Sequence, residues 1–225
     1  MKEFSDQKIV ASWEVNAAPW VTAVRDNEIE SRTLVTNKAI IDAVVNENIN
    51  SVLDVGCGEG WLVRELNKVG ISSLGVDAVS KFIEPAQQEG GGRFKTLSYE
   101  ELSYSVLKEK FDLVVCNFSL LGNESVIGLF KEIPFLLNDG GSFIIQTIHP
   151  VFGTGDSSYK DGWRKGSWDG FSNSFSDPAP WYFRTMETWK ALFLSNGFII
   201  REIIEPLNPK TQLAASMIIV GDKDR

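Results

Sequence analysis

The chain contains few of the residues that bind metals or form disulfides. Its 225 residues include two cysteines, one histidine and three methionines. Cys57 and Cys116 belong neither to a Cys-x-x-Cys pair nor to a Cys/His spacing typical of a zinc site. We therefore expect no metal centre and no disulfide framework, and two reduced thiols in a cytoplasmic protein.

Long hydrophobic runs and an excess of basic residues are missing as well. No segment reaches the roughly 18 uninterrupted apolar residues that a membrane span requires, and no apolar stretch follows a basic one at the N-terminus. The 22 Lys and Arg are outnumbered by 30 Asp and Glu, for a net charge of -8, whereas nucleic-acid-binding proteins usually carry a clustered basic face. We therefore expect a soluble, unexported protein with no membrane or nucleic-acid partner.

Short apolar segments alternate with amphipathic ones from about residue 50 onward, which is typical of βαβ units. Residues 198–204 and 216–220 predict an antiparallel hairpin at one sheet edge. The sequence thus predicts an α/β fold, a doubly wound, Rossmann-like sheet of seven mostly parallel strands with helices on both faces. The five strands expected before the hairpin cover residues 51–55, 73–76, 94–97, 111–117 and 142–148.

One domain over residues 1–225 is expected, because the length and the 43% hydrophobic content suit a single large core. Residues 1–49 predict two or three leading helices, and residues 50–149 form the alternating core. Residues 150–184 have no clear period and are rich in aromatic side chains, which indicates an insertion or lid. Residues 185–225 supply a helix and the hairpin.

A glycine-rich loop follows the first expected strand, in residues 52–60, Val-Leu-Asp-Val-Gly-Cys-Gly-Glu-Gly. Glycines here let the backbone turn sharply and approach a ligand that a Cβ would exclude. Their spacing is Gly-x-Gly-x-Gly, whereas dinucleotide sites more often show Gly-x-Gly-x-x-Gly. Asp54 and Glu59 would repel a diphosphate, so a cationic or zwitterionic ligand is favoured.

Asp77 ends the second expected strand, 23 positions after Asp54. This is close to the offset of about 20 residues at which an acidic side chain accepts hydrogen bonds from a ribose diol. The alternative is a surface turn followed by a solvated aspartate.

These segments resemble the class I S-adenosylmethionine-dependent methyltransferases. The resemblance covers residues 50–148 and includes the glycine loop, Gly75-Val76-Asp77, residues 111–117 and residues 136–141. It implies S-adenosylmethionine as cofactor and S-adenosylhomocysteine as product. It places the methionine part of the cofactor against the backbone from Asp54 through Gly56, Cys57 and Gly58, the ribose on Asp77, and the adenine beside Ala78.

Two parts of the implied cofactor site follow the third and fourth strands. Where the family often has an aspartate that binds the adenine amino group, this chain has Ser98, Tyr99 and Glu100, and the adenine partner stays open among them. Asn117 and Phe118 would lie near the sulfonium, because an amide and an aromatic face both favour positive charge.

The N-terminal segment 12–32 resembles a bacterial subgroup of small-molecule methyltransferases, in which the leading helices close over the cofactor. The resemblance implies that Arg32 pairs with the cofactor carboxylate through its two-pronged guanidinium. The alternative is a surface arginine paired with Glu28 or Glu30.

His149, the only histidine, follows the fifth expected strand at the edge where α/β sheets bind ligands. It is the candidate general base, since its ordinary pKa suits proton removal from a hydroxyl or amine. The alternative is that it caps the strand beside Pro150. Residues 117–120, Asn-Phe-Ser-Leu, lack the Asn/Asp-Pro-Pro-aromatic turn of methyltransferases that modify bases or glutamine amides, which argues against those acceptors.

The aromatic insertion supplies the candidate residues for binding the acceptor. A lid over an apolar pocket is one interpretation, and a cluster that only packs the insertion is the other. Arg164, Lys165 and Arg184 hint at an anionic acceptor, with charge pairing to nearby aspartates as the alternative. The substrate-binding candidates are Trp163, Trp181, Tyr182 and Arg184.

The leading hypothesis is an enzyme that moves a methyl group from S-adenosylmethionine to an oxygen or nitrogen of a small-molecule acceptor. One alternative is a non-catalytic S-adenosylmethionine-binding protein. An NAD-dependent oxidoreductase is a further one, which the glycine spacing and Glu59 disfavour. Neither the acceptor nor the oligomeric state follows from the sequence.

Overall fold

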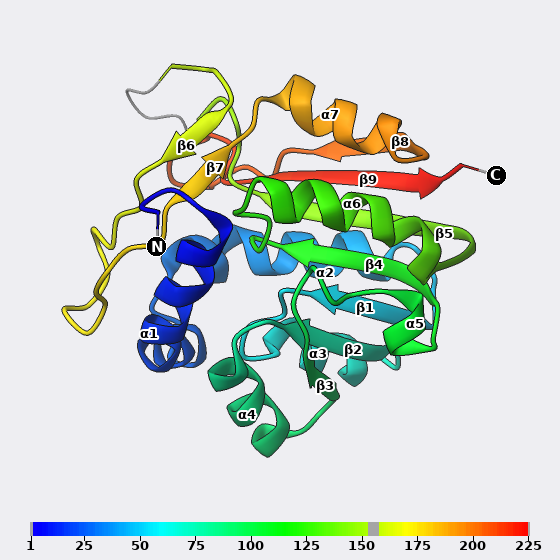
Figure 1. Ribbon diagram of the computed structural model, residues 1–225, viewed down its shortest axis with the longest axis horizontal. Coiled ribbons are helices and arrows are strands. Elements are labelled where there is room, and N and C mark those ends of the chain that lie inside the picture. Colours follow the sequence, from blue (N-terminus) through cyan, green and yellow to red (C-terminus); the bar gives the residue numbers. More distant parts are fainter. Residues whose placement is uncertain (1, 153–157, 225) are drawn as a thin grey trace.

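A computed structural model describes residues 2–152 and 158–224 of the chain. Seven strands of these residues form one sheet, in the order β3-β2-β1-β4-β5-β9-β8 (Figure 1). Strands β1 to β5 are parallel, and β9 runs antiparallel to both β5 and β8. The expected fold is confirmed. Its strands are β1 (Ser51–Val55), β2 (Ser72–Asp77), β3 (Arg93–Thr96), β4 (Phe111–Asn117), β5 (Leu137–Thr147), β8 (Phe198–Ile204) and β9 (Met217–Lys223).

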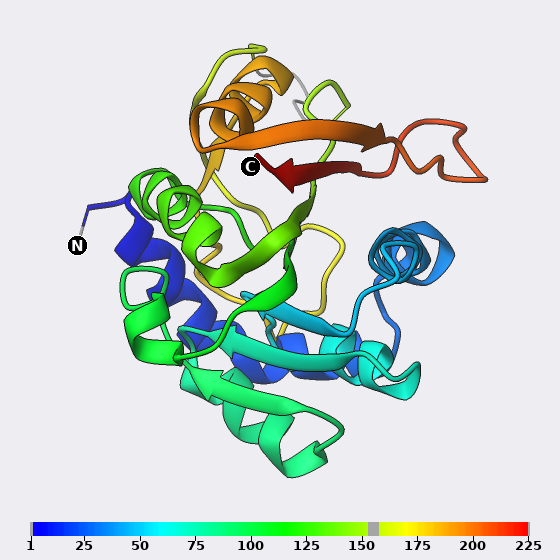
Figure 2. The same ribbon diagram turned by 90° about the vertical axis from the view of Figure 1, so that its right-hand side faces the viewer.

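Helices cover both faces of this sheet (Figures 1 and 2). Side chains of α2 and α3 pack on one face, and those of α6 and α7 pack on the other. None of the helices in the described part of the chain combines the length and the hydrophobicity that a bilayer crossing requires. The helices are α1 (Asp6–Arg25), the π-helix η1 (Arg32–Thr36), α2 (Asn37–Val45), α3 (Trp61–Lys68), α4 (Ser80–Glu89), α5 (Tyr104–Leu107), α6 (Glu124–Leu136) and α7 (Met186–Ser195).

The central strand β4 shows how the core is divided. Successive side chains of a strand point to opposite faces. Leu113 and Val115 therefore pack with α2 and α3, whereas Val114 and Cys116 pack with α6 and α7. All four are fully buried. This two-sided burial explains why the strand reads as a continuous apolar run.

The structure differs from the sequence prediction in two places. Strand β5 already begins at Leu137, so it includes the expected turn at residues 138–141, and its register with β4 shifts there. The insertion, for which no strands were expected, contains an antiparallel pair, β6 (Gly162–Arg164) and β7 (Trp181–Phe183). Residues 153–157 of that insertion lie outside the described residues.

The parallel strands end at the same edge of the sheet, and α1 lies across that edge (Figure 1). Ser5 caps α1, because its hydroxyl accepts the backbone N–H of Lys8 at 3.2 Å. The α1 helix also contacts α4. The loops that follow β1 to β5 therefore open beneath the leading helix.

Candidate functional site

A cavity of about 900 Å³ lies where α1 meets the carboxyl ends of the strands. Its wall includes residues of α1 and η1, the glycine loop, and the segments after β2, β3 and β4. Every predicted cofactor residue except Asp54 lines it, so the structure brings the implied site together. Those residues are Arg32, Gly56, Cys57, Gly58, Asp77, Ala78, Ser98, Tyr99, Glu100, Asn117 and Phe118.

The glycine loop turns as expected, with positive φ angles of 76° at Gly56, 55° at Gly58 and 84° at Gly60. The close approach, however, is made by protein. A Cβ on Gly56 would lie 2.3 Å from the Cβ of Ser119. At Gly58 the nearest atom would be 4.0 Å away, on Trp20. Only the backbone conformation therefore demands glycine at Gly58, whereas Ser119, in the segment after β4, also demands it at Gly56.

The amides of this loop are used inside the protein. The N–H groups of Gly56 and Cys57 both donate to the carbonyl of Val76, at 2.8 and 3.0 Å. The N–H of Gly58 donates to Asp77 Oδ2 at 2.9 Å. A dinucleotide site directs such amides at a pyrophosphate, so this arrangement disfavours an NAD site.

Asp77 holds the turn with both of its carboxylate oxygens. Oδ2 accepts from Gly58, and Oδ1 accepts the N–H of Val79 at 2.9 Å. Burial raises the pKa of Asp77 to about 6, although these two hydrogen bonds oppose the rise. Because each carboxylate oxygen has two lone pairs, Asp77 can still accept hydroxyl donors from the cavity that it lines.

Asp54 lies behind the loop, outside the cavity lining. Its side chain is 1% exposed, and Oδ1 has no hydrogen-bond partner among the described residues. Burial raises the pKa of this carboxyl to about 8, and the nearby charge of Asp77 adds to the rise. A buried carboxyl with such a pKa is largely protonated at neutral pH.

Arg32 opens the π-helix, an element that is frequent at functional sites. Its guanidinium carbon lies 4.8 Å from the ring of Trp61, and Nε donates to Asn37 at 3.2 Å. Nη2 is buried without a partner among the described residues, and burial lowers the pKa of Arg32 to about 10. The alternative ion pair is not formed within the described structure, where Glu30 instead pairs with Lys210.

The end of β4 carries a strained backbone that no sequence pattern announced. Phe118 has φ +53°, a conformation that is costly for a bulky side chain. Its N–H donates to the carbonyl of Gln146 at 2.8 Å, and the Ser119 hydroxyl donates to the carbonyl of Val55 at 2.7 Å. Asn117 Oδ1 is buried and unpartnered among the described residues. The surrounding strands thus impose the turn that presents residues 117 and 118 to the cavity.

Two of the three candidates for binding adenine already donate their hydroxyls within the protein. Ser98 donates to Glu101 at 3.0 Å, and Tyr99 donates to the carbonyl of Ser119 at 3.0 Å. Glu100 is exposed and lines the cavity beside them. The choice among the three stays open.

His149 does not line the cavity. It is 4% exposed, and its Nε2 lies 2.7 Å from Glu205 Oε1. Its Nδ1 accepts the N–H of Val151 at 3.2 Å, so the neutral ring carries its proton on Nε2 and donates it to Glu205. This geometry favours the strand-capping alternative over the role of a general base.

The four substrate-binding candidates also lie outside this cavity. Trp163 pairs with Tyr182 across the β6–β7 ladder, and Trp181 belongs to the same ladder. Arg184 is 3% exposed and donates to the carbonyls of Gly122 and Asn123 at 2.8 and 3.1 Å. Burial lowers the pKa of Arg184 to about 10. Its Nη1 and Nη2 both donate to protein oxygens, and the side chain does not line the cavity.

The leading helix supplies a cavity wall that the sequence indicated only in part. Trp13 and Trp20 are seven residues apart and so share one face of α1, and both line the cavity. Asp6 also lines it and accepts the N–H groups of Asn123 and Ser125 at 2.8 and 2.6 Å. This last contact spans more than a hundred residues, so local patterns gave no sign of it.

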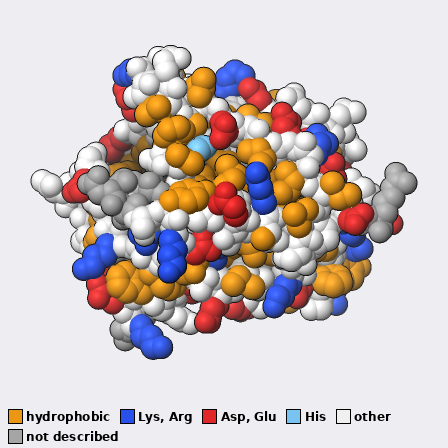
Figure 3. Space-filling model, turned by 90° about the horizontal axis from the view of Figure 1, so that it is seen from above, with side chains coloured by type: hydrophobic (Ala, Val, Ile, Leu, Met, Phe, Trp, Pro, Cys, Tyr) orange, Lys and Arg blue, Asp and Glu red, His pale blue; other side chains and the backbone are white. Residues whose placement is uncertain are grey.

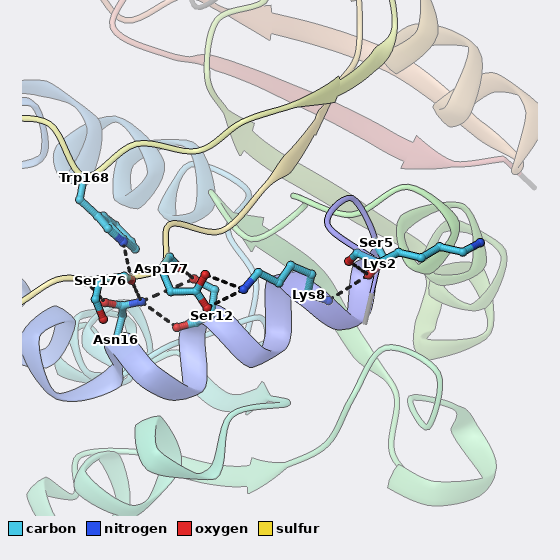
Figure 4. Close-up of polar contacts among 8 residues, drawn as sticks. All are labelled: Lys2, Ser5, Lys8, Ser12, Asn16, Trp168, Ser176 and Asp177. Carbon is cyan, nitrogen blue, oxygen red and sulfur yellow. Dashed lines mark hydrogen bonds and ion pairs between the residues drawn. The ribbon is translucent and has the colours of Figure 1, made fainter.

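The insertion acts on the cavity mainly by holding α1, as Figure 4 shows. Asn16 donates to the carbonyl of Ser176 at 2.7 Å and accepts its N–H at 2.9 Å. The Ser12 hydroxyl donates to the carbonyl of Asp177 at 2.5 Å. Among the described residues of the insertion, Phe171 alone lines the cavity. The insertion was the expected lid, but within the described residues α1 covers the cavity and the insertion braces α1 from outside.

Comparisons with known proteins agree on one kind of domain. A family model described as a methyltransferase domain matches residues 31–203. A ubiquinone biosynthesis O-methyltransferase from Pelagibacter ubique is 34% identical over 101 residues, which cover 44% of this chain and 42% of that one. The mitochondrial ubiquinone biosynthesis O-methyltransferase of Bos taurus is 35% identical over 109 residues, which cover 44% and 28%. The chain thus matches less than half the length of these curated relatives.

Solved structures show the same fold at low identity. The magnesium protoporphyrin IX methyltransferase of Synechocystis, crystallised with bound S-adenosylhomocysteine, has a TM-score of 0.68 and 18% identity, covering 97% of this chain and all of that one. A 1,6-didemethyltoxoflavin-N1-methyltransferase from Burkholderia thailandensis has a TM-score of 0.62 and 18% identity, covering 94% and 88%. The likeness extends over the sheet and the leading helices.

Proposed function

Because this chain belongs to the methyltransferase domain family, we propose that it transfers a methyl group from S-adenosylmethionine to an oxygen or nitrogen of a small molecule. One observation carries the proposal. Arg32, whose buried Nη2 has no partner among the described residues, and Asp77 line the same cavity. A guanidinium donor suits the cofactor carboxylate, and a carboxylate suits the ribose hydroxyls.

The remaining residues of the cavity fit the other parts of this cofactor. Asn117 offers a buried acceptor oxygen without a partner among the described residues, which suits the ammonium group. Ala78 follows β2 and offers an apolar contact for the adenine. Glu59 Oε1 is likewise buried and unpartnered in the described structure, although Glu59 Oε2 pairs with Arg25 and Arg64. A loop with acidic side chains nearby, whose backbone amides already donate within the protein, accepts a zwitterion better than a diphosphate.

Positioning is the main contribution of this chain to the reaction. When bound, the cofactor supplies a methyl group on a positively charged sulfur. Phe118 lines the cavity from the end of β4 beside Asn117, and its aromatic ring would favour the positive charge on that sulfur. α1 covers the cavity and limits the access of water, which supports in-line transfer to an oriented acceptor.

The proposal does not depend on a general base. The described residues that line the cavity include neither histidine nor lysine. A proton lost by an acceptor would therefore pass to a carboxylate of the lining or to water, and orientation can supply a large part of the rate enhancement. The role of His149 as a base is a prediction that this geometry does not support.

The relatives leave the acceptor atom open between oxygen and nitrogen. The curated relatives are named as O-methyltransferases, and one structural neighbour is named as an N1-methyltransferase. Both kinds support a small-molecule acceptor. The non-catalytic alternative predicts cofactor binding without methyl transfer.

Calorimetric titration separates these possibilities. We expect S-adenosylmethionine and S-adenosylhomocysteine to bind in a 1:1 ratio, and NAD to give no heat of binding. Incubation with methyl-labelled cofactor and a metabolite extract should then place label on small molecules. Binding of NAD alone would refute the proposal. Cofactor binding without methyl transfer to any molecule of the extract would favour the non-catalytic alternative.

We also propose a cytoplasmic protein with no nucleic-acid or membrane partner. The net charge of -8 supports this, and blue and red side chains are interspersed on the face shown in Figure 3. Cell fractionation, gel-shift assays with DNA and RNA, and vesicle sedimentation test the three parts separately. Retention on nucleic acid at physiological salt would contradict the second part.

A further inference from the structure

We infer that the acceptor carries no anionic group, so that the cavity takes neutral or cationic small molecules and discriminates against carboxylates and phosphates. This inference rests on the proposed function and specifies its substrate class. It contradicts the anionic acceptor that the basic residues of the insertion suggested in the sequence. The inference rests on the charges around the cavity.

Acidic groups predominate in the cavity lining. Among the described residues that line it, Arg32 is the single cation, whereas four residues are acidic. Arg32 lies between Trp61 and Trp20, and these neighbours place it beside the glycine loop. Once it pairs with the cofactor carboxylate, no lining cation remains to neutralise an acceptor. The acidic residues are Asp6, Glu59, Asp77 and Glu100.

Basic side chains close to the cavity are committed to other partners. Lys8, on the α1 helix, forms an ion pair with Asp177 at 2.5 Å. Arg184 donates to the backbone carbonyls of Gly122 and Asn123. Residues 153–157, Gly-Thr-Gly-Asp-Ser, contain no Lys or Arg. None of the Lys and Arg residues in the described part of the insertion lines the cavity.

Arg25 and Arg64 approach the glycine loop, yet both are paired with carboxylates: both contact Glu59, and Arg25 also pairs with Glu89 at 3.5 Å. They lie 3.0 and 2.5 Å from the same carboxylate oxygen of Glu59, whose side chain is 1% exposed. Moving either arginine away from Glu59 would weaken the ion pairing of a buried carboxylate, which is costly. Neither arginine can therefore bind an acceptor without breaking its ion pair with Glu59.

The N-terminus of α6 is a further place beside the cavity where an anion would be favoured, because helix N-termini carry free N–H groups and partial positive charge. Asp6 already occupies it from α1. Its carboxylate accepts the N–H groups of Asn123 and Ser125. A carboxylate or phosphate brought to this position would meet the negative charge of Asp6 and find those donors taken.

Part of the cavity wall is apolar. Its lining includes Val10, Leu121, Ile148 and Ala215. Burying an ion against such side chains without a partner is strongly unfavourable. Ligand cavities usually measure roughly 300–1,000 Å³, and this one is near the top of that range, at about 900 Å³. It therefore has room for an uncharged acceptor beside the cofactor.

A charge-sorted extract tests the inference. A metabolite extract is passed over a strong anion exchanger, and the flow-through and the eluted anions are each incubated with the full-length chain and methyl-labelled S-adenosylmethionine. We expect at least tenfold more label on metabolites of the flow-through. Equal labelling of the two pools, more label among the anions, or no label in the flow-through overturns the inference.

Binding of S-adenosylhomocysteine, measured by calorimetry on the same preparation, distinguishes the two levels of failure. If it does not bind, the proposed function is wrong. If it binds while the anions are labelled, only the inference about the acceptor fails.

A variant that adds one cation to the apolar wall gives an independent test. Ile148 is 40% exposed, so Ile148→Lys is compatible with folding, and Ile148→Met is a control of similar length without charge. The lysine variant should raise the ratio of anion label to flow-through label at least threefold over the methionine variant. Equal ratios would overturn the inference. Should Ile148→Lys lose binding of S-adenosylhomocysteine, Ala215→Lys against Ala215→Met repeats the comparison.

Discussion

The carboxylate of Asp77 accepts the backbone N–H of Gly58 at 2.9 Å, so one side chain both lines the cavity and fixes the glycine loop. Its second oxygen fixes the start of the next segment through Val79. The proposed ribose contact is therefore built on a side chain that the protein already holds in place. Such preorganisation lowers the cost of binding, because little has to be ordered when the ligand arrives.

Replacing Asp77 should weaken the cofactor complex. Asp77→Ala removes a charge-assisted acceptor, and such hydrogen bonds contribute about 1.5–3 kcal/mol each. We expect the Kd for S-adenosylhomocysteine to rise roughly tenfold to a hundredfold, as measured by calorimetry. Asp77→Asn keeps the size of the side chain and serves as the matched control, with a smaller loss. An unchanged Kd in Asp77→Ala would refute the ribose assignment.

Cofactor binding should depend on the protonation of Asp77. Burial raises the pKa of Asp77 to about 6, and only the ionised form accepts through both oxygens. The affinity for S-adenosylhomocysteine should therefore be constant above pH 7 and fall as the pH decreases through 6. Calorimetry between pH 5 and 8 measures this, with Asp77→Asn as the reference. A wild-type profile parallel to that of Asp77→Asn would rule out this titration.

Arg32 should discriminate between the whole cofactor and its nucleoside part. Arg32→Met should weaken S-adenosylhomocysteine at least tenfold, since a charge-assisted pair contributes about 1.5–3 kcal/mol. The affinity for 5′-methylthioadenosine, which lacks the amino-acid part, should change little. Arg32→Lys tests the two-pronged geometry, because it keeps the charge without the fork. Equal losses for both ligands would show that Arg32 supports the fold of the cavity rather than the carboxylate.

Asp54 should make the protein less stable as the pH rises. Its pKa in the folded protein is about 8, above the value of about 3.9 for an unfolded chain. The folded state therefore binds the proton more tightly. The stability gained in acid is lost between roughly pH 4 and pH 8, and each tenfold difference in proton affinity corresponds to about 1.4 kcal/mol.

The test is urea unfolding of wild type and Asp54→Asn between pH 4 and pH 9. The free energy of unfolding of wild type should fall relative to that of Asp54→Asn as the pH increases. A constant difference across this range would show that Asp54 does not titrate in the folded protein.

His149 should act on stability more than on turnover. Both ring nitrogens are bonded within the protein, to Glu205 and Val151. His149→Ala should lower the free energy of unfolding by about 1–3 kcal/mol through the unsatisfied groups it leaves. The Kd for S-adenosylhomocysteine should stay the same. Transfer of label from S-adenosylmethionine to the extract pool that wild type methylates should fall less than tenfold. A general base would cost at least about a hundredfold in turnover, and such a loss at unchanged stability would restore that role.

The sequence predicts the sheet well because its signals are local. The bounds expected for β1, β4 and β8 are those observed, since each is a run rich in apolar residues. Strand β5 begins five residues early, because Leu137 already pairs with Phe111 before the register shifts at the expected turn. Pairing between strands is set by tertiary contacts, which a single segment does not record.

The same reasoning explains the candidate site. Asp77 and Asn117 line the predicted cavity because parallel strands end at one edge. His149 follows β5 at that edge but lies outside the cavity, because its ring bonds to Glu205 and Val151.

Trp163 and Arg184 do not line the cavity, because their positions depend on how the insertion folds back on other elements. The contact of Asp6 with the start of α6 also links distant segments. Chemistry alone indicates which residue types are able to bind, and topology decides which of them meet.

Gly56 is fixed by Ser119 of the neighbouring segment, since a Cβ there would lie 2.3 Å from that side chain. Any descendant of this chain that abandoned catalysis and kept its sheet would still need this glycine. The glycine loop therefore indicates the fold. Arg32, with a buried donor that has no protein partner among the described residues, indicates cofactor binding. Family members that have lost catalysis should therefore lack the arginine while they keep the glycine loop.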